Sequence, residues 1–120
     1  MHVLRSTIFT LPLLSLLAIP ALAHSALDHA SPATGGKVRK SPPRVELWFT
    51  EEIEPAFSSL AVFDSSGREV DKRDTTASSN KKLLFVSIPP LSSGRYKVVW
   101  RVDSVDKHKT EGSFPFVVLP

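Results

Sequence analysis

Hydrophobic and polar residues alternate in short runs along most of the chain after residue 24. In the clearest run, Tyr96, Val98, Trp100 and Val102 alternate with mostly polar neighbours. Alternation in twos predicts a β-strand with one face in the core. Comparable runs occupy residues 45–49, 60–63, 83–88 and 114–118.

Turn-forming residues separate these runs, at 31–36, 41–43 and 64–67, and residues 75–80 form a polar segment that we expect to be a loop. No long stretch has helical periodicity. Short strands at this spacing predict an all-β fold, a Greek-key β-sandwich of two packed antiparallel sheets with about seven strands. Trp100 is predicted to lie in its core, and Pro115 predicts that the last strand is an edge strand or contains a bulge.

Residues 1–23 have a different pattern, typical of a secretory signal peptide. Arg5 supplies a positive charge, residues 7–19 are largely apolar, and residues 21–23 have the small-x-small pattern of a cleavage site. A transmembrane anchor is the alternative, but it needs about 20 apolar residues, and this run is shorter and interrupted by proline. We therefore expect the protein to be exported, with cleavage after Ala23.

Cleavage would leave one domain at residues 24–120, which we expect to be a monomer. The sequence has no cysteine, which excludes disulfides and thiolate metal ligands. The full chain has 15 basic and 12 acidic residues, a formal charge of +3. The basic residues are scattered instead of forming one patch with stacking aromatics, so we do not expect nucleic-acid binding.

Removal of residues 1–23 would make His24 the N-terminal residue. Its free amine and its imidazole Nδ1 could then chelate one metal ion together. Asp106 and His108, two residues apart just after the clearest strand, would face the same side of an extended chain. Nitrogen donors with a carboxylate oxygen suit Cu(II), although zinc or nickel could use similar donors. Asp106-Lys107-His108 alone is a weak signal, because exposed loop residues often have this spacing.

The chain after residue 23 also resembles the CopC-like copper-resistance proteins of the bacterial periplasm. The resemblance extends to residue 118, and its more specific motifs lie at the two ends. The matching residues are His24, Ser31-Pro32-Ala33, Gly35, Val45-Glu46-Leu47, Phe49-Thr50-Glu51, Leu91, Gly94-Arg95-Tyr96-Lys97-Val98, Trp100-Arg101, Ser104, Asp106, His108, Gly112, Phe114 and Phe116-Val117-Val118.

This resemblance implies a cupredoxin-like, immunoglobulin-like sandwich that binds one Cu(II) per chain. It assigns His24, Asp106 and His108 as ligands. Glu51 would be a nearby acid, which we expect to orient the amine or an imidazole instead of binding the ion directly. The alternative for Glu51 is a solvated glutamate at a strand end.

Three further positions affect the expected copper site. Met1 is the only methionine, so the separate Cu(I) site that some relatives build from methionines is not expected. Lys107 stands where many relatives have glycine; if that position needs a positive φ, the lysine is strained and its charge lies close to the metal. His29 is expected to be a surface residue on the face opposite His24.

The resulting prediction is a protein, not an enzyme, that sequesters or delivers Cu(II) for copper resistance. The resemblance implies an inner-membrane copper transporter as a partner. An alternative is a copper monooxygenase acting on polysaccharides, which also uses an amine and two imidazoles. Against it, few aromatic residues are available, and Asp106 would occupy the position that oxygen needs. A third alternative is a structural or adhesive sandwich without metal.

Overall fold

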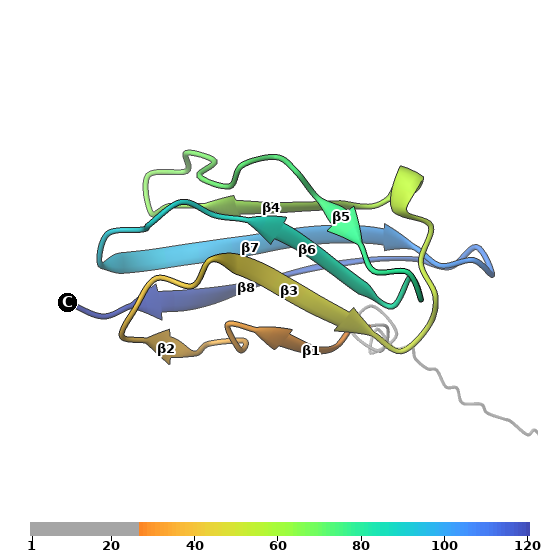
Figure 1. Ribbon diagram of the computed structural model, residues 1–120, viewed down its shortest axis with the longest axis horizontal. Coiled ribbons are helices and arrows are strands. Elements are labelled where there is room, and N and C mark those ends of the chain that lie inside the picture. The colour runs from red at the N-terminus through yellow and green to blue at the C-terminus, as the bar shows by residue number, and fades with distance from the viewer. Residues whose placement is uncertain (1–26) are drawn as a thin grey trace, which may run out of the picture.

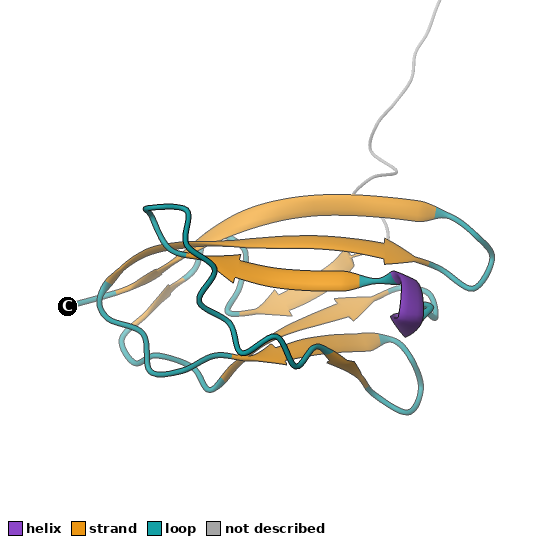
Figure 2. Cartoon of the chain, turned by 90° about the horizontal axis from the view of Figure 1, so that it is seen from above, coloured by secondary structure: helices purple, strands orange, loops and turns teal. Residues whose placement is uncertain are grey.

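The computed structural model describes residues 27–120, which form two stacked four-stranded β-sheets (Figures 1 and 2). One sheet has the order β1-β3-β6-β5 and the other β2-β8-β7-β4. The predicted signal peptide and His24 lie outside the described residues. The strands are β1 (Leu27–Ser31), β2 (Lys37–Val38), β3 (Arg44–Phe49), β4 (Ser59–Phe63), β5 (Thr76–Ala77), β6 (Leu83–Ser87), β7 (Gly94–Asp103) and β8 (Lys109–Val118), with a short 3₁₀ helix, η1 (Pro55–Phe57).

The core lies between the two sheets and follows the alternation in the sequence. Every second residue of β3 and β7 is buried, and Trp100 is only 1% exposed. Trp100 faces Gly112 across the β7–β8 ladder, where a Cβ on residue 112 would lie 2.8 Å from the indole ring. A side chain at 112 would therefore displace Trp100. The predicted core role of Trp100 is confirmed.

The all-β sandwich is confirmed, with eight strands in the described residues instead of about seven. The expected loop at 75–80 contains β5, which pairs with β6 along the edge of the first sheet. The prediction missed β5 because Thr76 and Ala77 are too few to show an alternating pattern. Only β5–β6 and β7–β8 are neighbours in both sequence and sheet, and every other connection crosses between sheets, as in a Greek-key sandwich.

Pro115 lies where β8 has a full neighbouring strand on one side only. It pairs in regular register with Lys97 of β7, and no bulge interrupts that ladder. On its other side β2 reaches only Val117 and Val118, and the Pro115 carbonyl accepts a hydrogen bond from the Gly35 N–H at 2.7 Å. The missing N–H therefore costs no ladder hydrogen bond. The prediction of an edge or bulged strand is nevertheless wrong for the strand as a whole, because β8 lies between β2 and β7 and its ladder with β7 is regular.

Three segments meet at one end of the sandwich, on the right in Figure 1. β3 ends there at Phe49, and the first described residue, Leu27, pairs with Phe49. The turn between β7 and β8 projects from the same end. Within the described part of the chain, no helix has the length and apolar character needed to cross a bilayer.

Candidate metal centre

Residues 104–108 form a tight turn that joins β7 to β8. The Ser104 N–H donates to the His108 carbonyl, and the Lys107 N–H donates to the Ser104 carbonyl, both at 2.9 Å. Lys107 has φ of 75°. These features describe a three-residue hairpin loop whose last residue is left-handed, a position that favours glycine. The turn carries Asp106 and His108 on either side of Lys107.

Ser104 fixes the arrangement of this turn. It is 6% exposed, and its hydroxyl donates a hydrogen bond to the Asp106 carboxylate and accepts one from the His108 N–H at 3.1 Å. The Ser104 hydroxyl and the neighbouring His108 both hold the pKa of Asp106 below its ordinary value, with the serine hydrogen bond the larger cause. Asp106 therefore stays ionised to lower pH than a free aspartate.

A second segment, the residues that follow β3, is attached to the turn by backbone hydrogen bonds. The Val105 N–H donates to the Glu52 carbonyl at 3.0 Å, and Ile53 forms an isolated β-bridge with Ser104. Just before it, Phe49 packs edge-to-face against Trp100 of β7, with ring centroids 5.5 Å apart. Backbone pairing and core packing therefore hold Glu51 beside the β7–β8 turn.

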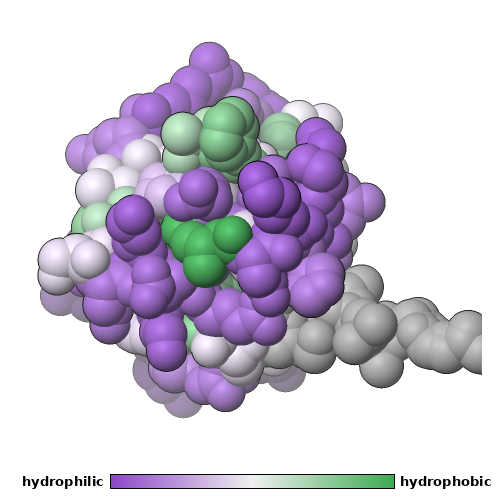
Figure 3. Space-filling model, turned by 90° about the vertical axis from the view of Figure 1, so that its right-hand side faces the viewer, coloured by the Kyte–Doolittle hydropathy of each residue, from purple (hydrophilic) through white to green (hydrophobic). Residues whose placement is uncertain are grey.

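Glu51, Asp106 and His108 come together at this end of the molecule. One donor atom from each lies within 4.8 Å of the other two, and His108 Nδ1 lies 3.3 Å from Asp106 Oδ1. All three residues are exposed. Figure 3 views this end, which is mostly hydrophilic with a few hydrophobic side chains at the surface. One imidazole and two carboxylates are hard and borderline donors that suit a divalent transition-metal ion.

The structure thus brings together three of the four residues singled out from the sequence. The fourth, His24, lies outside the described residues. The role of Ser104 was missed, although Ser104 is one of the residues that match the resemblance. A serine two residues before an aspartate is too common to predict such a hydrogen bond without the turn geometry.

From the sequence, we expected Lys107 to be strained if its position required a positive φ. Its φ is positive. The Lys107 side chain is exposed, and no ion pair within residues 27–120 involves it. A side chain in this left-handed conformation costs about 1–2 kcal/mol relative to the right-handed one. The turn is therefore strained and carries an unpaired positive charge between Asp106 and His108.

His29 lies on the outer face of the β1–β3 pair, where it stacks on Trp48 with centroids 4.4 Å apart and an interplanar angle of 8°. Its Nδ1 lies 2.6 Å from Asp28 Oδ2. The predicted surface position is confirmed. A register shift between Leu27 and His29 interrupts the alternation by which His29 was placed opposite His24. Because of this bulge, counting in twos no longer supports that part of the prediction.

Comparisons with known proteins agree with the fold. The family model described as the CopC domain matches residues 27–119. Copper resistance protein C of Xanthomonas campestris pv. juglandis is 33% identical over 111 residues, which cover 87% of each chain. The crystal structure of CopC from Methylosinus trichosporium OB3b superposes with a TM-score of 0.74 at 39% identity, covering 81% of this chain and 95% of that chain.

A longer protein contains a similar segment. The copper transport protein CutJ of Bacillus subtilis is 29% identical over 110 residues, which cover 88% of this chain but only 20% of that protein. The family model covers most of the chain and agrees with both the relatives and the fold. The chain belongs to the CopC family.

Proposed function

We propose that this protein binds one Cu(II) ion per chain in the periplasm, through His24, Asp106 and His108, and sequesters or delivers it. The observation that carries this proposal is the convergence of Glu51, Asp106 and His108 within 4.8 Å at one end of the sandwich. Two residues from a turn and one from a separate segment supply an imidazole and two carboxylates, a donor set that a divalent transition-metal ion can use.

The start of β1 supports the inclusion of His24. Leu27 pairs with Phe49, two residues before Glu51, so the chain enters the sandwich at the end that carries the cluster. His24 precedes Leu27 by three residues, which can span at most about 10 Å. Once the signal peptide is removed, its amine and imidazole would add two nitrogen donors to His108 and Asp106. Three nitrogens and one carboxylate oxygen suit the tetragonal geometry of Cu(II).

Glu51 then acts beside the ligands. One of its carboxylate oxygens lies within 4.8 Å of a donor atom of Asp106 and of His108. A small movement would let it accept a hydrogen bond from an imidazole or from the amine and orient that donor toward the ion. Copper should be held as Cu(II), because the sequence has no cysteine and only Met1 could supply a soft thioether.

Membership of the CopC family supports a copper-resistance role over catalysis, since the relatives are copper resistance proteins and not enzymes. We therefore do not retain the monooxygenase alternative. The exposed position of the cluster suits exchange of the ion with another molecule. CutJ, a copper transport protein, contains a similar segment as one fifth of its length. This supports an inner-membrane copper transporter as the recipient.

The test is copper titration of the protein that starts at His24, followed by electron paramagnetic resonance. We expect one Cu(II) per chain and an axial signal from mixed nitrogen and oxygen ligation. His108→Ala should change the signal and weaken binding, whereas His29→Ala should leave both unchanged. Equal effects of the two substitutions would contradict the assignment of the site.

A further inference from the structure

Lys107 has an unusual position, because it lies between two proposed copper ligands in the turn between β7 and β8. Its backbone is left-handed, with φ of 75°. Its exposed ammonium has no ion-pair partner among residues 27–120. The positive charge opposes tight copper binding, and the left-handed backbone makes the turn less stable. A glycine at position 107 would remove both effects.

The charge of Lys107 bears on the copper ion. Cu(II) brings two positive charges, and ionised Asp106 and Glu51 bring two negative ones, so the loaded cluster is neutral before Lys107 is counted. Adjacent Cα atoms lie 3.8 Å apart and a lysine side chain adds several ångströms, so an ammonium between two ligands lies on the order of 10 Å from the ion. That separation is comparable to the Debye length at physiological ionic strength, so repulsion between the ammonium and the dication is only partly screened.

The strain of Lys107 acts on a different property. The hydrogen bonds of the turn join protein atoms only, from Lys107 N–H to the Ser104 carbonyl and from Ser104 N–H to the His108 carbonyl. The left-handed conformation is therefore required by the turn itself, whether or not copper is bound. Strain should lower the stability of the fold, while charge should lower the affinity for copper, so substitutions can separate the two effects.

We propose that Lys107 tunes this site for release: its charge lowers the affinity for Cu(II) and speeds the departure of the ion. The inference rests on the proposed copper-binding function and extends it, because a residue that weakens binding favours delivery over permanent sequestration. Lys107 is thus an affinity-setting residue and not a ligand.

The experiment compares Lys107→Gln, which removes the charge and keeps a side chain at the left-handed position, with Lys107→Gly, which removes both. Lys97→Gln is the matched control, because Lys97 is an exposed lysine of β7 that lies about 20 Å along the strand from Asp103, the last residue of β7. Cu(II) affinity is measured at low ionic strength by competition with a chelator. Release is measured as the rate of Cu(II) transfer to that chelator, and stability as the melting temperature of the protein without added copper.

We expect both Lys107 variants to bind Cu(II) roughly three- to tenfold more tightly than the unsubstituted protein and to release it more slowly. The gain should shrink at about 1 M salt, where the Debye length falls to about 3 Å. Lys97→Gln should change neither quantity. Lys107→Gly alone should raise the melting temperature, by about 4–8 °C for each kcal/mol of strain that it removes.

The inference is overturned if Lys107→Gln binds no more tightly at low ionic strength, or if Lys97→Gln produces the same gain. Absence of copper binding by the unsubstituted protein and by every variant would instead refute the proposed function, and this inference with it. The melting temperatures would then still report whether the turn is strained. The two failures are therefore distinguishable.

Discussion

The molecule contains two histidine–aspartate pairs of similar composition but different surroundings. In one, His29 Nδ1 lies 2.6 Å from Asp28 Oδ2; in the other, His108 Nδ1 lies 3.3 Å from Asp106 Oδ1. All four side chains are exposed. By distance alone, the pair on β1 is the closer one, yet it is the pair in the turn that we propose as part of a metal site.

The surroundings explain this difference. His29 stacks on Trp48 on the flat outer face of a sheet, and among the described residues no third metal-binding side chain joins the pair. The second pair projects from the end of the sandwich, where the segment after β3 adds Glu51. A sheet face spreads its side chains apart, whereas the end of a sandwich brings segments together. The convergence of separate segments, more than the histidine–aspartate pair, is therefore the feature on which the proposed metal site rests.

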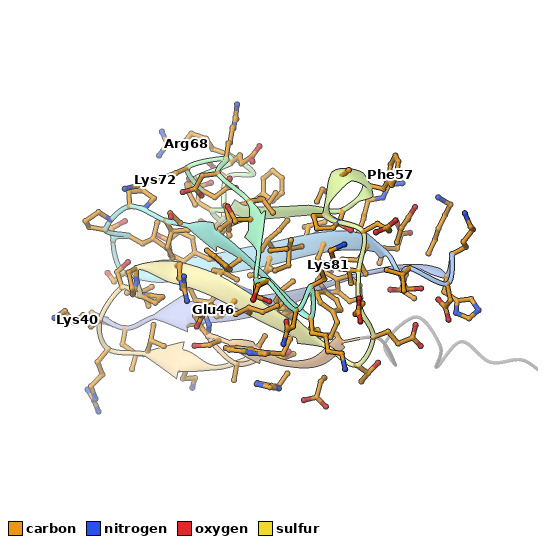
Figure 4. All side chains as sticks on the ribbon, turned by 45° about the vertical axis from the view of Figure 1, so that its right-hand side comes forward. Lys40, Glu46, Phe57, Arg68, Lys72 and Lys81 are labelled. Carbon is orange, nitrogen blue, oxygen red and sulfur yellow. The ribbon has the colours of Figure 1, made fainter. Side chains whose placement is uncertain are left out.

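The two ends of the molecule also differ in their surface residues, as labelled side chains illustrate. Phe57 lies toward the end that carries the turn, whereas Lys40, Arg68 and Lys72 lie toward the opposite end (Figure 4). Phe57 of η1 is 69% exposed, and it shares a surface hollow with Asp103 and Lys109, the last pair before the turn. The end that carries the cluster is therefore not uniformly polar.

The two pairs should differ most in how copper affinity responds when their aspartates are substituted. Asp106→Asn keeps the shape of the side chain but removes the anionic oxygen, so copper affinity should fall roughly 100-fold, at least as much as loss of a residue that orients a metal ligand. Asp28→Asn should leave the affinity unchanged. Both are measured by competition with a chelator of known affinity. A comparable loss from Asp28→Asn would show that the β1 pair also holds the ion.

A smaller effect is expected from Ser104, which supports the turn pair through its hydroxyl group. Ser104→Ala removes the hydrogen bond that lowers the pKa of Asp106, so this pKa should rise toward its ordinary value. Copper affinity should fall about three- to tenfold, because the carboxylate is less firmly oriented. Carboxyl chemical shifts followed by NMR in the metal-free protein report the pKa.

Ser104→Ala should also change how the free energy of unfolding depends on pH. The folded pKa of Asp106 lies below that of the unfolded chain, so its stabilising contribution is present above about pH 4 and is lost as pH falls through the folded value. Ser104→Ala should therefore destabilise the protein more at neutral pH than under strongly acidic conditions. The matched control is Ser66→Ala, because the Ser66 hydroxyl lowers the pKa of Asp64 in the same way. Ser66→Ala should raise the pKa of Asp64 and leave the pKa of Asp106 unchanged. A change in the pKa of Asp106 would show that the effect of such a substitution is not local.

The sequence predicted the fold well where its pattern was long and regular. From Tyr96 to Asp103, β7 alternates without interruption, and the structure buries the predicted side chains, including Trp100. Short elements were missed, as for β5, because two residues cannot display a period. The bulge between Leu27 and His29 also escaped prediction, since one additional residue reverses the alternation without leaving a clear mark in the sequence.

The candidate site was predicted in its residues but not in its construction. Spacing and resemblance identified Asp106, His108 and Glu51, and the structure brings them together. The function of Ser104 depends on a turn whose hydrogen bonds follow from the pairing of β7 with β8, which sequence spacing alone does not specify. The left-handed backbone of Lys107 could be stated only as a condition before the turn type was known.

Copper binding as proposed requires, above all, a free N-terminal amine at His24. The decisive measurement is a Cu(II) titration of two proteins, one beginning at His24 and one with a single glycine placed before it. We predict that the extended protein binds Cu(II) at least tenfold more weakly and gives an altered electron paramagnetic resonance signal, because the amine and imidazole no longer belong to one chelating residue. Equal affinity and an identical signal in the two proteins would contradict it.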